Sequence, residues 1–287
     1  MNFFTTLKKG AAAAASSYKL ILLIWVTALV LTLAVGLPLR VFLSSMFGNS
    51  LAIERLADGF DIGLAGDLGK PFGALMASVS AGTFFIGLAG FFLMTFFAGG
   101  LFKRFTLSWG GLKVSDFLKA SAVNFVPFLK IALLMILITG AYTFVVIGIP
   151  GIVSLIAFDS SVTTGKIFRI FYIIWALGLP VWLFVADASR RWIAATGSRK
   201  ALRALGAGFR AMKEKFWLSY GIVLAVMVLN TAVVIAILWF AAISTPEKGI
   251  MVFLFFVATQ TLFIIRLFMK AWRYASVCEV IQMKNLF

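Results

Sequence analysis

The sequence contains few residues that could do chemistry. It has no histidine, and Cys278 is its only cysteine. Histidine catalysis, cysteine clusters and an intrachain disulfide are therefore excluded, together with the metal sites that use those ligands. The sequence also lacks a P-loop, a zinc-protease helix and a nucleophile elbow. It predicts neither an enzyme nor a bound cofactor or metal.

Two amides are the best polar candidates within the apolar stretches. Asn230 and Gln260 flank a predicted turn near Pro246, each about 21–24 Å from it along a helix. We expect both side chains at one depth, where a hydrogen bond between them contributes about 0.6 kcal/mol in a membrane. A structural hydrogen bond is the first interpretation, and a polar site that faces a substrate is the alternative.

A cluster of ionic residues follows the fourth apolar stretch. Asp187 and Arg191 are spaced for an ion pair along a helix, which is the simpler interpretation. The alternative is a lipid-phosphate site formed by Arg190 and Arg191, with Asp187 orienting them. Together with Arg203 and Arg210, these two arginines are the candidate contacts to anionic lipid headgroups.

Long hydrophobic helices must position these residues. Only 13% of the chain is charged and 62% is hydrophobic, whereas a soluble domain has about 25% and about 45–50%. Six stretches reach the roughly 20 residues of a spanning helix. They are about Leu20–Leu43, Met76–Phe102, Ile131–Ala157, Ile167–Ala186, Trp217–Ser244 and Ile250–Phe268. Because strand alternation is absent and hydrocarbon forces the backbone to bond internally, we predict an all-α polytopic membrane helix bundle.

The first stretch resembles a secretion signal at its start, where Lys8 and Lys9 precede small residues. Its apolar run is longer than the 7–15 residues of a signal core, and no clear cleavage site follows. We expect it to be a permanent spanning helix.

The distribution of charge predicts the orientation. With the amino terminus inside, the outer segments are neutral in sum and the inner segments carry the whole net charge of +16. This is the positive-inside pattern, which places both termini in the cytoplasm, and we expect the inner membrane of a bacterium. The basic residues serve topology and contact with anionic lipid rather than nucleic acid, because no folded basic domain remains to bind it.

Amphipathic segments precede the odd-numbered helices. They occupy about 1–19, 103–130 and 187–216, and each combines apolar residues at helical spacing with flanking cations. Such leader helices are typical of the membrane interface. The alternative is a connector helix packed on the bundle.

The chain also repeats itself. Gly36-Leu37-Pro38 and Gly148-Ile149-Pro150 follow a lysine at similar distances, and each even-numbered helix ends in cations beside aromatic residues. We interpret the chain as one integral membrane domain of three parallel leader-plus-hairpin units, about 1–105, 106–192 and 193–287. The alternative is that any series of hairpins under the positive-inside rule looks repetitive.

Three further patterns concern packing and loops. Gly178-Leu179-Pro180 predicts a bend in the fourth helix. Small residues from Ser78 to Gly90 predict close helix–helix approach in the second, with a pore lining as the alternative. The outer segment 44–70 has four acidic residues, but their spacing does not suit a calcium loop.

The pattern of six spans, amphipathic leaders and aromatic-basic exits resembles a family of bacterial inner-membrane proteins, and the stretch Phe209–Asn230 carries most of the likeness. The family includes the membrane domain joined to glycerophosphodiester phosphodiesterases. The resemblance implies the architecture only. The catalytic phosphodiesterase domain has no counterpart in this sequence, and no site residues transfer.

These observations favour a non-enzymatic integral membrane protein, an accessory or scaffold component acting on lipids or on a membrane complex. The alternative is a permease for a lipid-like or apolar substrate with a cavity near Asn230 and Gln260. An intramembrane enzyme is a third class, which would need a nucleophile and a base to converge. The expected partners are anionic membrane lipids, and other membrane proteins or further copies of this chain.

Overall fold

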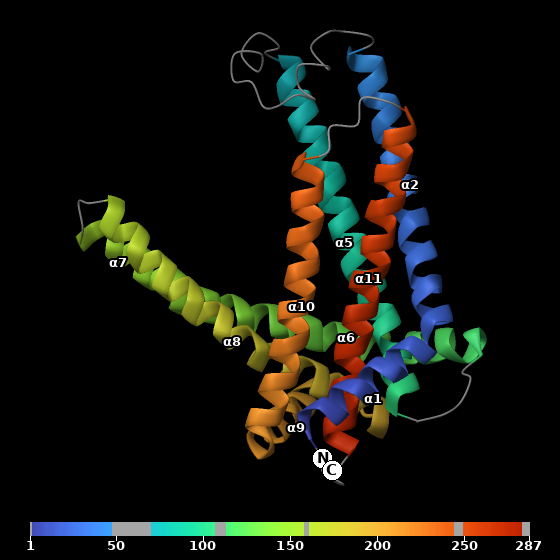
Figure 1. The fold of residues 1–287 in the computed structure, drawn as a ribbon, viewed down its shortest axis with the longest axis vertical. Coiled ribbons are helices and arrows are strands. Elements are labelled where there is room, and N and C mark those ends of the chain that lie inside the picture. The colour runs from blue at the N-terminus through green and yellow to red at the C-terminus, as the bar shows by residue number, and fades with distance from the viewer. Residues whose placement is uncertain (1, 48–69, 107–112, 158–160, 244–248, 283–287) are drawn as a thin grey trace. The chain divides into compact units, whose positions relative to one another are not determined.

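All secondary-structure elements in the described part of the chain are helices. The computed structural model describes residues 2–47, 70–106, 113–157, 161–243 and 249–282. The helices are α1 (Phe3–Ser16), α2 (Tyr18–Phe47), α5 (Lys70–Thr106), α6 (Val114–Thr143), the π-helical η1 (Phe144–Gly148), α7 (Ile149–Ala157), α8 (Ser161–Thr196), α9 (Ala201–Glu214), α10 (Phe216–Ile243) and α11 (Gly249–Gln282) (Figure 1). They form two compact units, one of Met1–Leu22 with Thr95–Phe287 and one of Leu23–Met94.

Six helical stretches among the described residues are long and apolar enough to cross a membrane. They are Tyr18–Phe42, Met76–Thr106, Val114–Ser154, Gly165–Thr196, Phe216–Phe240 and Ile250–Ile281. Each coincides with one of the six stretches predicted from the sequence. The predicted all-α, six-helix membrane architecture is therefore confirmed.

The core of the first unit lies at the ends of the spans that the sequence predicts to be cytoplasmic. Phe184 and Ile193 of α8, Ile222 of α10 and Val277 of α11 are fully buried there. The other halves of these helices expose large apolar side chains, such as Ile235. Lipid tails are as apolar as these side chains, so an exposed apolar surface is stable in that region without a protein partner.

The three predicted leaders fold differently. Residues 3–16 and 201–214 form separate helices, α1 and α9. The leader within 103–130 does not end before the span: α6 continues from Val114 to Thr143 through Pro127. Non-helical dihedrals at Ser17 and Lys215 separate the other two leaders from their spans. Pro127 removes one backbone donor, but α6 continues past it.

The leader α1 packs on the last helix, α11. A Cβ atom added at Gly10 would collide with Ser276, so the two backbones approach as closely as small residues allow. The indole N–H of Trp272 also donates a hydrogen bond of 2.9 Å to the carbonyl of Leu7. The first and last described helices are thereby held together.

The same kind of contact recurs for the other two leaders. Gly208 of α9 lies against Ser189 of α8, and Gly100 of α5 lies against Ser121 of α6, where an added Cβ would stand 2.5 Å from each serine Oγ. Each leader therefore crosses the C-terminal part of an even-numbered span through a glycine and a serine. The division into three hairpin units stays a prediction, and these crossings support it.

The second unit pairs α2 from Leu23 with α5 up to Met94. Of the glycines in the predicted small-residue stripe, Gly82 lies in ordinary van der Waals contact with Leu39, at 3.5 Å from an added Cβ. Gly87 and Gly90 face open space. Among these three glycines, contact with a neighbouring helix is therefore seen only at Gly82.

Candidate functional site

A buried ionic cluster joins α8 to α11. The side chain of Asp187 is fully buried, and its two oxygens accept from two arginines. Arg273 Nε lies 2.7 Å from Oδ2, and Arg190 Nη1 lies 3.1 Å from Oδ1. Both guanidinium side chains are mostly buried as well. The carboxylate therefore links two helices electrostatically, through residues that are 86 positions apart along the chain.

Arg191, the predicted partner of Asp187, has different neighbours. It is buried and lies near Cys278 and Glu279 in the C-terminal part of α11. The ion pairs of Asp187 go to Arg190, one position earlier, and to Arg273. The simpler interpretation was right in kind, since Asp187 makes a structural ion pair, but the i,i+4 partner was wrong.

The four arginines predicted to contact anionic lipid are separated by the fold. Arg190 is paired with Asp187 and Arg191 is buried near Cys278, while Arg203 and Arg210 are exposed on α9. A guanidinium bonded to a buried carboxylate has fewer donors left for a lipid phosphate. Lipid contact stays a prediction for all four, and the structure favours the two on α9.

The predicted amphipathic stripe of α9 faces protein over part of its length. Leu205 and Met212 are buried, and the ring of Phe209 meets Trp182 of α8 edge-on at 6.0 Å. Leu202 is 75% exposed. The packed-connector alternative thus holds for the buried side of α9, and Leu202 with the cations remains for a lipid or another ligand.

Asn230 and Gln260 lie on α10 and α11, which pack against each other, and both residues are half-buried. Their hydrogen bond stays a prediction. The turn near Pro246 and the acidic part of the segment 44–70, from 48 to 69, lie outside the described residues.

Around Pro180 in α8, the backbone carbonyls have side-chain partners. The hydroxyl of Tyr142 donates to the carbonyls of Ile174 and Trp175, and the hydroxyl of Tyr220 donates to the carbonyl of Leu177. Proline disrupts the helical hydrogen bonds of the preceding turn, so these carbonyls benefit from outside donors. Two flanking helices, α6 and α10, thereby stabilise the region where the sequence predicts a bend.

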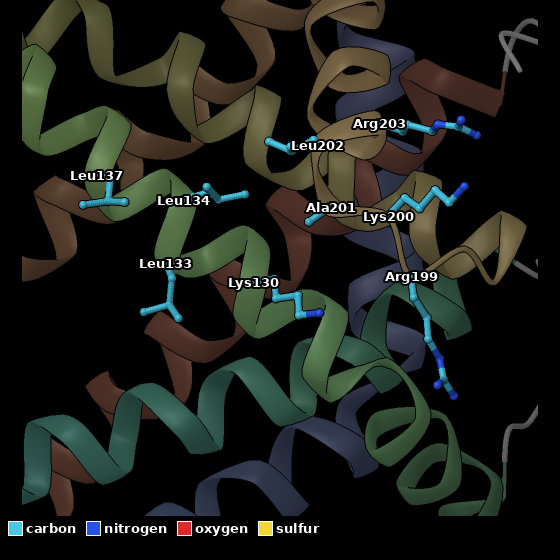
Figure 2. Close-up of a pocket in the computed structure, with 9 residues that line it drawn as sticks. All are labelled: Lys130, Leu133, Leu134, Leu137, Arg199, Lys200, Ala201, Leu202 and Arg203. Carbon is cyan, nitrogen blue, oxygen red and sulfur yellow. The ribbon is translucent and has the colours of Figure 1, made fainter.

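A cavity of about 700 Å³ opens between α6 and the start of α9. Figure 2 shows its lining, which comes from α6 and from the segment that joins α8 to α9. The lining residues are Lys130, Leu133, Leu134, Leu137, Arg199, Lys200, Ala201, Leu202 and Arg203. Four of these nine are cations and none is acidic, which makes the cavity a strongly positive site with apolar walls.

Local backbone structure explains why three cations meet Lys130. Gly197 adopts a left-handed φ of 68° and donates its N–H to the carbonyl of Ile193 at 2.8 Å, which ends α8 as a C-terminal glycine commonly does. The chain then resumes as α9 after Lys200, whose extended backbone precedes the first turn. The short connector turns the chain back toward α6 and places its basic residues at the mouth of the cavity.

The cations of the cavity have no acidic partner among the described residues. The ion pairs seen in this part of the chain both belong to Asp187. Lys130, Arg199, Lys200 and Arg203 therefore give the lining an excess of positive charge, which favours the binding of an anion.

Sequence reasoning singled out only Arg203 of this group. Lys130 is the lysine that precedes Gly148-Ile149-Pro150 in the repeat pattern, and Leu133, Leu134 and Leu137 follow it at helical spacing on one face. That signal was present in the sequence. The sequence does not show that the segment 199–203 lies next to α6, because this contact depends on how α9 packs against the other helices.

Comparison with known proteins adds no relative. No protein-family model matches the chain, and neither the curated proteins nor the solved structures contain a match. The six long apolar helices alone identify the chain as an integral membrane protein. The resemblance to phosphodiesterase-linked membrane domains stays an expectation.

Proposed function

We propose that this integral membrane protein is a non-enzymatic accessory or scaffold component that acts on lipids at its basic face, in the inner membrane of a bacterium. The observation that carries the proposal is the cavity between α6 and α9. It combines cations that have no acidic partner among the described residues with leucines at the start of the apolar part of α6. This combination suits an amphiphilic anion at a membrane interface.

The polar groups outside the cavity support a structural role. Tyr142 and Tyr220 satisfy carbonyls near Pro180, and Asp187 is neutralised by two arginines. Polar groups that are hydrogen-bonded in this way stabilise helix packing and have less capacity to bind a substrate. Among the described residues, three or more metal-ligating side chains do not converge.

The second candidate, a permease for a lipid-like or apolar substrate, depends on Asn230 and Gln260. Both are half-buried on packed helices, and neither lines the cavity at the basic end. If they face a substrate, changing both to leucine abolishes transport without loss of folding. If they serve packing, we expect the double variant to retain function and to lose about 1 kcal/mol of stability or less.

The experiment that tests the proposed function is purification in a mild detergent followed by quantitative lipid analysis. We expect anionic phospholipids to be enriched over their proportion in the source membrane, at one or a few per chain. A lipid profile identical to that of the bulk membrane contradicts the proposal, and saturable uptake of an apolar substrate by reconstituted vesicles would favour the permease.

A further inference from the structure

We propose that the cavity between α6 and α9 holds one anionic phospholipid, with its phosphate among Lys130, Arg199, Lys200 and Arg203 and one acyl chain along the leucines of α6. This inference rests on the proposed function and specifies the site and the ligand. The lipid-binding function could hold elsewhere on the basic face even if this site were wrong.

The lining is arranged as an amphiphile requires. In Figure 2, the cations of the 199–203 segment lie to one side of Lys130, and Leu133, Leu134 and Leu137 follow along α6 to the other. From Lys130 to Leu137 the helix rises about 10 Å. A charged group at one end of this path and a hydrocarbon chain along the rest would each meet a matching surface.

The position of the cavity along the span agrees with this arrangement. Lys130 is the last charged residue of α6 before the uninterrupted apolar run that reaches Ser154. Insertion energetics keep such a lysine at the interface, where lipid phosphates lie, while the following turns enter the hydrocarbon. The phosphate and the acyl chain therefore reach the cavity from the same bilayer that surrounds the helix.

A soluble anion would match only half of the lining. Leu133 is 50% exposed and Leu137 is 69% exposed, and a free phosphate leaves these side chains uncovered. A neutral lipid would cover the leucines but leave four neighbouring cations uncompensated. Charge and apolar surface together favour one molecule that carries both features.

The test titrates the full-length protein in detergent with dioleoyl phosphatidylglycerol and measures binding by native mass spectrometry. The key variant is K130Q/R203Q, which removes a cation from each side of the cavity. Its matched control is K113Q/K119Q, which removes the same charge from exposed positions at the N-terminal end of α6 outside the cavity. Circular dichroism and size-exclusion profiles establish that each variant is folded.

We expect K130Q/R203Q to weaken binding of phosphatidylglycerol about tenfold or more, because each basic residue near an anionic headgroup contributes measurably to affinity. The control should stay within about twofold of the parent, and K130R/R203K should restore affinity. Dioleoyl phosphatidylcholine should bind the parent about tenfold more weakly. Equal losses in the key variant and the control would overturn the site.

A second pair of variants tests the acyl chain. Leu133→Trp places a bulky side chain in the cavity. Ile136→Trp is the control, because Ile136 is about equally exposed on α6 but does not line the cavity. We expect only Leu133→Trp to weaken lipid binding, by about tenfold. Competition by millimolar inorganic phosphate that displaces the lipid fully would show a phosphate site without a lipid and overturn the proposal.

These outcomes separate the two proposals. If the parent prefers phosphatidylglycerol and the cavity variants leave that preference intact, the site is wrong and the lipid-binding function stands. If the parent shows no preference between the two phospholipids, both proposals fail.

Discussion

Asp187 shows how a single residue can decide helix packing at the basic end of the molecule. Its carboxylate is fully buried and is bonded to Arg273 from α11 and Arg190 from its own helix. Burying ions is costly, and the attraction repays the cost only when both partners and their hydrogen bonds are present. The cluster thus fixes the packing arrangement of α8 and α11 and contributes little net stability.

Removing the carboxylate should expose that dependence. We expect Asp187→Asn to destabilise the protein by about 3 kcal/mol, because two mostly buried arginines lose their counter-charge. Arg190→Gln should cost less, since the Arg273 pair remains. Thermal unfolding in detergent, followed by circular dichroism, measures both. A larger effect for Arg190→Gln would contradict the central role of Asp187.

At the scale of elements, glycines at helix crossings determine which leaders pack tightly. Gly208 lies against Ser189 and the carbonyl of Val185, while Gly206, two residues earlier on α9, faces open space. The two positions share a helix and a residue type and differ only in their surroundings. They form a matched pair for testing the contact between α9 and α8.

Alanine at these positions should act in opposite directions. Gly208→Ala adds a methyl group where an atom of α8 already lies, and we expect a net loss of about 1 to 2 kcal/mol. Gly206→Ala should raise stability by about 0.5 to 1 kcal/mol through helix propensity alone. Melting temperatures in one detergent compare the two. Stabilisation by both substitutions would show that α9 does not pack as described.

α6 illustrates a limit of periodicity as a guide to elements. The amphipathic residues before Lys130 and the apolar run after it were interpreted as two helices, but they are one helix from Val114 to Thr143. When one helix passes from an interfacial to an apolar environment, its residue pattern changes, and the change resembles a boundary between two helices. Only a break in backbone geometry, such as that at Ser17, produces one.

For the whole molecule, orientation in the membrane remains the central prediction. Lys166 and Arg199 lie beyond opposite ends of the apolar part of α8, and both are exposed. Cys278 is buried, so it contributes little background to thiol labelling. These three residues allow the predicted orientation to be measured in intact cells.

We expect a membrane-impermeant maleimide to label Lys166→Cys from outside the inner membrane and to label Arg199→Cys only after the membrane is permeabilised. The reason is that insertion leaves cation-rich segments in the cytoplasm. Labelling of Arg199→Cys alone in intact cells would reverse the orientation, and with it the cytoplasmic placement of both termini.

The sequence by itself determined the class of protein and the number of spans. Hydrocarbon requires long apolar helices and leaves no other backbone structure at that depth, so composition and length are enough. The same local information identified Asp187 as an ion-pair residue, because one of its partners, Arg190, lies within one turn of the same helix.

The tertiary structure decided which distant residues meet. The pairing of Asp187 with Arg273 spans 86 residues, and the meeting of Lys130 with Arg199, Lys200 and Arg203 depends on where α9 folds against α6 and α8. Basic residues at the ends of spanning helices are interchangeable for insertion, because the orientation depends on their charge and not on which residues they contact. Side-chain packing distinguishes them: Arg190 and Arg273 belong to a buried ionic network, whereas Lys130 and Arg203 line an open cavity.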